Sequence, residues 1–279
     1  MLEYDGGAFS GWQIQQNAKS IQGELEKALQ VYLSSEARKR DIQLEEEVRI
    51  TASGRTDAQV SAKAQVISFT WPHEIIFSKD RFIEAVNGLT PREISMIDAV
   101  LVAPSFDARH SPHTKCYCYS IFNRKVRSAL HHAASLWVRE ALDIESMQRA
   151  ASLLVGTHDF AGFRASDCSA SSTVRTILSS EFTKNGDMLE YRIVGKGFLK
   201  QMVRAIVGTL LEIGRGKSTV ESMNEVLEKK ERNLAGPTVP GFGLMLEWVR
   251  YQDEKEFFGN LSEFQSSREG SESAKPSAT

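Results

Sequence analysis

Residues 174–194 decide the fold class, and they read VRTILSSEFTKNGDMLEYRIV. Apolar and β-branched residues recur through 174–182 and 188–194, as they do in strands. The residues between these runs, Asn185-Gly186-Asp187, are typical of a hairpin turn. Because strands joined by so short a turn pair antiparallel, the segment predicts an antiparallel sheet.

Helical and extended patterns surround this hairpin without a regular alternation. Apolar residues at helical spacing predict helices from Ser20 onward and over 79–87, 144–154, 198–214 and 218–230. Extended apolar runs predict further strands at 66–69, 94–102, 115–122 and 243–249. We expect Ser20 to cap the first helix, Gly88 to end the second, and Ser218 with Glu221 to form the capping box of the last. This mixture favours an α+β fold with a largely antiparallel sheet over a doubly wound parallel fold.

The length and composition fit a globular chain of one large or two modest domains. The 279 residues are 41% hydrophobic and 25% charged, which is enough for a proper core. A break at Ser111-Pro112 predicts two units, 1–110 and 111–251. Residues 252–279 are rich in Ser, Glu and Lys, and we expect them to form a disordered tail. No apolar run approaches the roughly 20 residues of a membrane span.

The net charge of −2 is unevenly distributed along the chain. Six of the 36 acidic and three of the 34 basic residues follow Tyr251, which leaves the preceding body slightly basic. Basic residues cluster at 38–40, at 124–127, from Lys196 to Arg204 and at 215–217. Such clusters suit a phosphate backbone, although any single cluster is better explained as solvated surface charge.

Several classes of chemistry find no support in the sequence. It has no phosphate-binding glycine loop, no dinucleotide fingerprint, no nucleophile elbow and no histidine pair at metal-ligand spacing. We therefore expect an activity that needs neither a metal nor a nucleotide cofactor. The three cysteines argue against a disulfide framework, and Cys116 and Cys118 should share one strand face.

Three segments are candidates for a functional site. The loop over 52–58, ASGRTDA, places Arg55 two residues before Asp57, where the guanidinium would hold the carboxylate ionised. The alternative is a structural turn with a surface ion pair. Arg204, at the edge of an apolar helical face, either reaches solvent or pairs with a buried acid. Tyr117 lies in a predicted strand, where most aromatic residues belong to the core.

Taken together, these segments resemble the tRNA pseudouridine synthase A (TruA) family. The resemblance covers about residues 2–251, in family order and spacing. Its matching segments are LEYDG with GWQ near the start, GRTDA at 54–58, FDAR at 106–109, YCY at 117–119, HDF with FR at 158–164, MVR at 202–204 and GL at 243–244.

The resemblance implies a fold, a partner and roles for individual residues. It implies two similar α/β-mixed halves that share a sheet around a central basic cleft, and a homodimer. Asp57 matches the catalytic aspartate and is expected to be the nucleophile, with Arg55 in the same loop motif. Tyr117 matches the tyrosine that packs on the target base, and Arg204 the arginine that pairs with the aspartate. Lys196 and Lys200 are our candidates for binding the RNA backbone.

The implied reaction is the isomerisation of uridine to pseudouridine in the anticodon stem-loop of tRNA, at positions 38 to 40. It conserves atoms and charge, so it needs no redox cofactor, and it needs a carboxylate that acts as nucleophile or base. The uridine must leave its stack at a cost of a few kcal/mol, which stacking on an aromatic ring can partly offset. A cytoplasmic location is expected, or an organellar one if a targeting segment precedes Leu2.

The chain departs from the family pattern directly after Asp57-Ala58. Gln59 and Ser61 replace a Gly and a His of the family, so we expect Gln59 to avoid a positive φ and the loop geometry to differ. The alternative reading is an RNA-binding member of the same fold that is inactive or has altered specificity.

Overall fold

The predicted hairpin is present and lies inside a much larger sheet. The structure is a computed structural model that describes residues 1–44 and 46–252. Strand β9 (Val174–Asn185) pairs antiparallel with β10 (Met188–Gly195), with Tyr191 opposite Phe182. Gly186 supplies the left-handed residue of the turn, with a φ of 58°.

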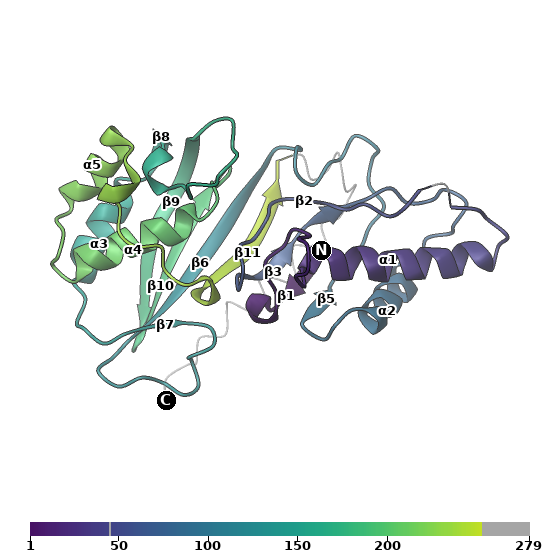
Figure 1. Cartoon of the computed structure of the whole chain (residues 1–279), viewed down its shortest axis with the longest axis horizontal. Coiled ribbons are helices and arrows are strands. Elements are labelled where there is room, and N and C mark those ends of the chain that lie inside the picture. Colours follow the sequence, from purple (N-terminus) through teal and green to yellow (C-terminus); the bar gives the residue numbers. More distant parts are fainter. Residues whose placement is uncertain (45, 253–279) are drawn as a thin grey trace, which may run out of the picture.

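Within the described residues, the main sheet has nine strands in the order β5-β1-β3-β11-β6-β10-β9-β8, with β7 beside β6 (Figure 1). Its other strands are β1 (Leu2–Tyr4), β3 (Ser61–Gln65), β5 (Ile94–Met96), β6 (His113–Asn123), β7 (Leu136–Val138), β8 (Gly156–Asp159) and β11 (Leu244–Tyr251). Only the β3–β11 and β6–β7 pairs are parallel among these strands. A small second sheet pairs β2 (Thr51–Ala52) with β4 (Ile67–Ser68). The α+β class and the largely antiparallel sheet are thus confirmed.

Helices gather at the two ends of the main sheet (Figure 1). Helices α1 (Ile21–Arg38) and α2 (Lys79–Leu89) lie beside the β5–β1–β3 end. Helices α3 (Ile144–Ser152), α4 (Met202–Gly214) and α5 (Glu221–Lys229) lie beside the β8–β9–β10 end. Ser20 caps α1 as predicted, because its side chain accepts a hydrogen bond from the Gly23 N–H.

Several predicted boundaries were wrong for local reasons. The strand predicted at 66–69 is present but shorter, since β4 covers only Ile67–Ser68. Helix α2 continues through Gly88 to Leu89. Ser218 does not cap α5, whose N-cap position is Val220 without a side-chain cap. Helix α4 begins at Met202, because Gln201 before it is left-handed with a φ of 60°.

The core follows the alternation of side chains along the central strands. On β6, Tyr117, Tyr119 and Ile121 share one face and are buried, and β10 places Tyr191 and Ile193 opposite them. These residues belong to one hydrophobic cluster that also includes residues of α1 and α4. Burying a large apolar side chain contributes about 1.5–3 kcal/mol to stability. Because the cluster is continuous, it stabilises the packing of both ends of the sheet.

The opposite face of β6 carries the two cysteines. Cys116 and Cys118 are both buried there, as their spacing predicted, and their pKa values are raised to about 12, mainly by burial. Their thiols are therefore protonated at neutral pH.

Two further expectations concern the C-terminal tail and helices that could cross a membrane. The predicted tail of 252–279 falls, apart from Gln252, outside the described residues. In the part of the chain that the structure does describe, none of the helices has the length and apolarity needed to cross a bilayer.

Candidate active site

The loop that carries Asp57 connects β2 to β3 and is held by backbone from distant segments. The Trp12 N–H donates to the Thr56 carbonyl at 3.0 Å. Gly11, with a φ of 104°, lies directly against the backbone of residues 56–58. A Cβ on Gly241 would lie 2.3 Å from the Ala58 carbonyl oxygen, so only glycine allows the chain to approach here.

A buried polar network fixes the first half of the same loop. The Tyr4 hydroxyl hydrogen-bonds the Thr56 hydroxyl at 2.9 Å. Gln65 accepts from the Ser53 hydroxyl at 2.6 Å and donates to the Gly54 carbonyl at 2.8 Å. Burial raises the pKa of Tyr4 to about 12, against the opposing effect of these hydrogen bonds, so its phenol stays neutral. A polar residue such as Gln65 at an inward strand position is the sequence signal that could have revealed this network.

Asp57 and Arg204 meet although 147 residues separate them in the chain. Nη1 of Arg204 donates to Oδ2 of Asp57 at 3.0 Å, and Nε donates to the Val239 carbonyl at 2.8 Å. The Arg204 side chain is only 15% exposed and the Asp57 side chain 19%. Of the two alternatives for Arg204, the structure shows pairing with an acid, and Arg204 reaches it from the first turn of α4.

Tyr117 lies beside this ion pair in the middle of β6. Its side chain is 7% exposed, and its ring meets Phe198 edge-on with centroids 5.1 Å apart. Burial raises the pKa of Tyr117, and the electrostatic effects of Tyr4 and Asp57 raise it further. One strand position along the same face, the Tyr119 hydroxyl donates to the Pro240 carbonyl at 2.9 Å, next to the Val239 carbonyl that holds Arg204.

The other predicted site residues do not contact Asp57. Arg55 is exposed, and no described residue makes a hydrogen bond or ion pair with its side chain. Lys200 is in the turn before α4, where it forms an ion pair with Asp167 at 2.6 Å. Lys196 follows β10 directly and is exposed.

The expectation for Gln59 was wrong. Its φ is 66°, so Gln59 adopts the left-handed conformation that a glycine would provide. The surrounding contacts impose this conformation at a cost of about 1–2 kcal/mol. Ser61 accepts a hydrogen bond from the Gly6 N–H at 3.1 Å, which directs its hydroxyl toward the start of the chain.

Lys115 is a residue of this region that the sequence reasoning missed. It is 8% exposed, and its ammonium group donates to the Ser53 carbonyl at 2.5 Å. Burial, together with the smaller effect of the positive charges of Arg109 and Arg175, lowers its pKa to about 8. Its position two residues before Tyr117, and so on the same strand face, was the available signal.

Asp57, Arg204 and Tyr117 together supply one carboxylate, one guanidinium paired with it and one buried phenol. A carboxylate held in this way can act as a nucleophile or a base without any further titrating group. Within residues 1–44 and 46–252, no cluster of His, Cys, Asp and Glu side chains is arranged to hold a metal.

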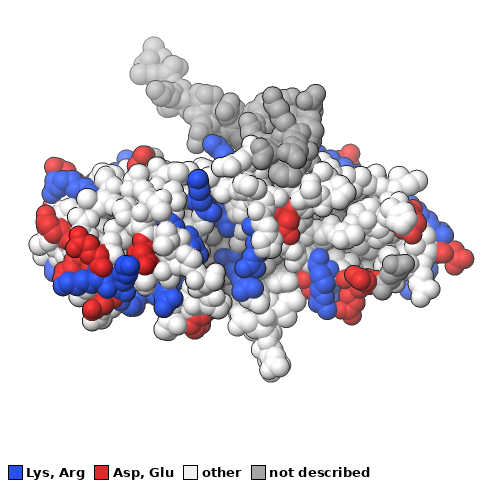
Figure 2. Space-filling view, turned by 90° about the horizontal axis from the view of Figure 1, so that it is seen from above, with Lys and Arg blue, Asp and Glu red and all other residues white. Residues whose placement is uncertain are grey.

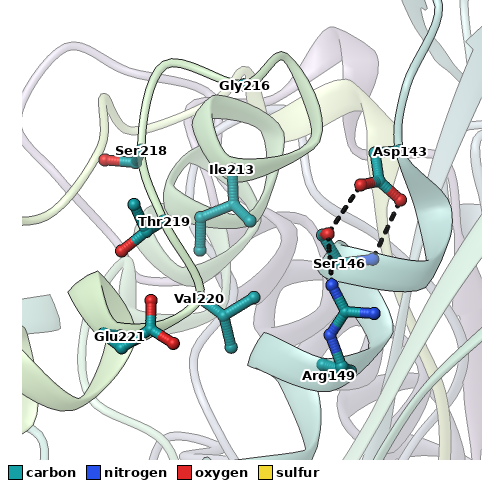
Figure 3. A pocket seen from close by; sticks show the side chains of 9 residues that line it. All are labelled: Asp143, Ser146, Arg149, Ile213, Gly216, Ser218, Thr219, Val220 and Glu221. Atoms are coloured by element: carbon teal, nitrogen blue, oxygen red, sulfur yellow. Dashed lines mark hydrogen bonds between the residues drawn. The ribbon is translucent and has the colours of Figure 1, made fainter.

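A separate hollow of about 450 Å³ opens between α3, α5 and the end of α4 (Figure 3). Its polar side chains bond to one another: Ser146 donates to Asp143 at 2.6 Å and accepts from Arg149 at 2.7 Å. None of the predicted site residues lines it. The hollow is therefore a different place from the Asp57–Arg204 pair.

Comparison with known proteins identifies a family and relatives to which this chain is similar. A family model described as tRNA pseudouridine synthase matches residues 150–252. The chain is 41% identical to tRNA pseudouridine synthase A of Myxococcus xanthus, over 90% of this chain and 91% of that protein. It is 40% identical to the protein of the same name from Pelobacter propionicus, over 90% and 97% of the two chains.

Proposed function

The chain belongs to the tRNA pseudouridine synthase A family, and from this membership we propose that it isomerises uridine to pseudouridine in the anticodon stem-loop of tRNA, at positions 38 to 40. The observation that carries the proposal is the pairing of Asp57 with Arg204 beside Tyr117. With Arg55, these are the positions at which the sequence resembles the catalytic centre of the family.

The reaction breaks the bond between N1 of uracil and C1′ of the ribose and forms a bond between C5 and C1′. The proton on C5 leaves and N1 gains one, so atoms and charge balance. Asp57 acts as the nucleophile in this scheme. Arg204 holds the carboxylate in one position, because its guanidinium is itself fixed by the Val239 carbonyl.

The target uridine must leave the RNA stack to reach Asp57. Unstacking costs a few kcal/mol, and contact with an aromatic ring returns about 1–3 kcal/mol. Tyr117 is positioned for this contact because Phe198 supports its ring from the side. Arg55 is exposed on the loop that carries Asp57, so it is available to contact the RNA or to assist the chemistry.

RNA would approach the face on which β6 and β9 begin. Figure 2 looks down on this face and shows Lys and Arg side chains gathered over the middle of the molecule. We assign this region to the basic cleft expected between two similar halves, residues 1–110 and 111–251. Lys196 and Lys200 belong to its phosphate-binding surface in this proposal, and the active form is a homodimer in the cytoplasm. A mass near 31 kDa in light scattering would contradict the dimer.

The proposed function is tested by mapping pseudouridine in tRNA. Unmodified tRNA is incubated with the purified protein and the modified positions are located by chemical labelling. Asp57→Asn keeps the side-chain shape but removes the charge, so product should disappear while tRNA binding survives. Because the loop is fixed mainly by backbone contacts, stability should change by no more than about 1 kcal/mol.

The control is Asp80→Asn, which removes an exposed acid in the first turn of α2. It should leave product formation unchanged. Turnover by Asp57→Asn within about tenfold of the parent would remove Asp57 from the mechanism. Absence of product with the parent protein on every tRNA tested would instead favour the alternative of an inactive RNA-binding member.

A further inference from the structure

A group of three cations lies next to the loop that carries Asp57. Lys115 is near the start of β6, Arg175 is near the start of β9, and Arg109 is in the turn before β6. The positive charges of both arginines act on Lys115 strongly enough to lower its pKa. The strand pairing brings Arg175 near Lys115, because β10 places Gly195 opposite Lys115 and β9 places Ile177, two residues after Arg175, opposite Gly195. Arg109 follows Ala108, whose N–H donates to Ser68 of β4, and β4 pairs with the strand that leads into the Ser53 carbonyl bound by Lys115. The three groups thus come from separate segments that meet in one region.

None of the three cations has an acidic partner among the residues that the structure describes. Lys115 donates to the Ser53 carbonyl, and Arg175 donates to the Ser172 and Val174 carbonyls at 2.9 and 2.7 Å. The side chain of Arg109 is exposed and makes no hydrogen bond or ion pair within that part of the chain. Asp107, in the same turn, is engaged by the backbone N–H groups of residues 109 and 110 and by the His110 ring.

Keeping like charges together in this way costs free energy unless an anion joins them. The cost is greatest for Lys115, because its ammonium group is buried and only one of its three N–H donors is used by a described residue. Gly54 makes room for it: a Cβ at this position would lie 2.6 Å from the Lys115 nitrogen. The loop that carries Asp57 thus also contacts the buried Lys115 ammonium group, through Ser53 and Gly54.

Lys115 also lies close to Tyr117 along strand β6. Lys115 and Tyr117 are two residues apart on β6, so they share a face and are about 7 Å apart along the strand. A nucleotide whose base reaches Tyr117 would carry its phosphate past Lys115. A planar guanidinium such as Arg175 or Arg109 suits the tetrahedral oxygens of that phosphate.

We propose that Lys115, Arg109 and Arg175 form a binding site for one backbone phosphate of the RNA, adjacent to the nucleotide that enters the active site. This proposal rests on the proposed function, because it assumes that the substrate is RNA. In this site the two arginines contact the phosphate, and Lys115 couples the bound phosphate to the Ser53–Gly54 backbone. Phosphate binding would then order the same loop that carries Asp57.

The test combines neutral phosphates in the RNA with variants of the protein. Anticodon stem-loops are made with a single methylphosphonate at each linkage within two nucleotides of the target uridine. Affinity is measured for the parent protein and for Arg109→Gln and Arg175→Gln. Arg92→Gln, which removes an exposed arginine before β5, is the matched control. The arginines carry the test because, in the proposed site, they contact the phosphate directly.

One linkage should lower the affinity of the parent protein by about tenfold or more when its charge is removed. Arg109→Gln and Arg175→Gln should each weaken binding to natural RNA and should lose little further affinity with that linkage neutralised. Arg92→Gln should behave as the parent does. The site would be overturned if both arginine variants bound natural RNA within twofold of the parent. It would also be overturned if neutralising the linkage lowered the affinity of the variants by the same factor as that of the parent.

Pseudouridine formation by the parent protein is measured in the same samples. Product formation without the coupling between arginine and linkage overturns the phosphate site alone. The coupling without product supports the site and contradicts the proposed activity. A parent protein that neither binds the stem-loop nor forms product overturns both.

Discussion

At the scale of single residues, Gln59 shows how the loop is constrained. It adopts a φ of 66°, which costs an L-residue about 1–2 kcal/mol relative to glycine. A glycine at this position would lose more conformational freedom on folding, which offsets about 0.5–1 kcal/mol of the gain in stability. We therefore predict that Gln59→Gly raises the free energy of unfolding by up to about 1 kcal/mol.

Chemical denaturation measures this change, and Gln59→Ala separates the effect of conformation from that of the side chain. Alanine keeps the strain, so Gln59→Ala should not stabilise the protein. Stabilisation by both substitutions to the same extent would contradict the argument from φ.

Lys115 makes a second residue-scale prediction, on how stability depends on pH. Its pKa is about 8 in the folded protein and 10.5 ordinarily, so the unfolded chain binds more protons between these values. Stability therefore rises as pH increases through this window, and the cost of the buried charge is fully present below pH 8. The difference corresponds to a contribution on the order of 3 kcal/mol.

Lys115→Met removes this dependence. The variant should gain most relative to the parent at pH 7 and least near pH 10, where the parent's amine is neutral. Unfolding by urea at several pH values measures the difference. Lys63→Met, at an exposed lysine of β3, is the control. Parallel curves for the parent and Lys115→Met would show that Lys115 does not titrate in this window.

At the scale of elements, the segment between β10 and α4 contains two lysines, Lys196 and Lys200, for which the sequence predicted the same role. Lys196 is exposed, whereas Lys200 forms an ion pair with Asp167 at 2.6 Å and must break it to contact RNA. We predict that Lys196→Ala weakens tRNA binding and lowers the salt slope by about 1, and that Lys200→Ala has the smaller effect. Titrations of tRNA at several salt concentrations test this order. Equal and large effects would show that the Lys200–Asp167 pair opens on binding.

The same segment shows what the sequence could predict about elements. The hairpin of β9 and β10 was predictable because its pairing depends on neighbouring residues and a short turn. The start of α4 was not, because the left-handed conformation of Gln201 depends on tertiary contacts and has no sequence signal.

The candidate site divides in a similar way. Asp57, Tyr117 and Arg204 could be proposed because they lie in recognisable motifs. The contacts of Lys115 and the network of Tyr4 and Gln65 were harder to predict, because Tyr4 bonds Thr56 and Lys115 bonds Ser53 across more than 50 positions of the chain. Their members look like ordinary strand residues until the sheet brings them together.

At the scale of the whole molecule, β11 joins what the sequence suggested were two units. This last strand pairs in parallel with β3, placing Leu246 beside Ala62, and antiparallel with β6, placing Leu246 beside Tyr117. A strand from residues 111–251 thus completes the sheet of residues 1–110. One unit cannot unfold without exposing the edge of the other.

We predict that residues 1–110 and 111–251 unfold as one cooperative unit, even if each forms half of the active site. The tryptophans allow each unit to be followed separately: Trp12 and Trp71 lie in the first, and Trp137 and Trp248 in the second. Two variants that each keep a single tryptophan, one in the first unit and one in the second, should give coincident urea transitions by fluorescence. Leu246→Ala, at a fully buried position of β11, should lower both midpoints together and cost about 2–5 kcal/mol. Two separated transitions, or a fragment of residues 1–110 that unfolds cooperatively by itself, would show that β11 links units that are stable without it.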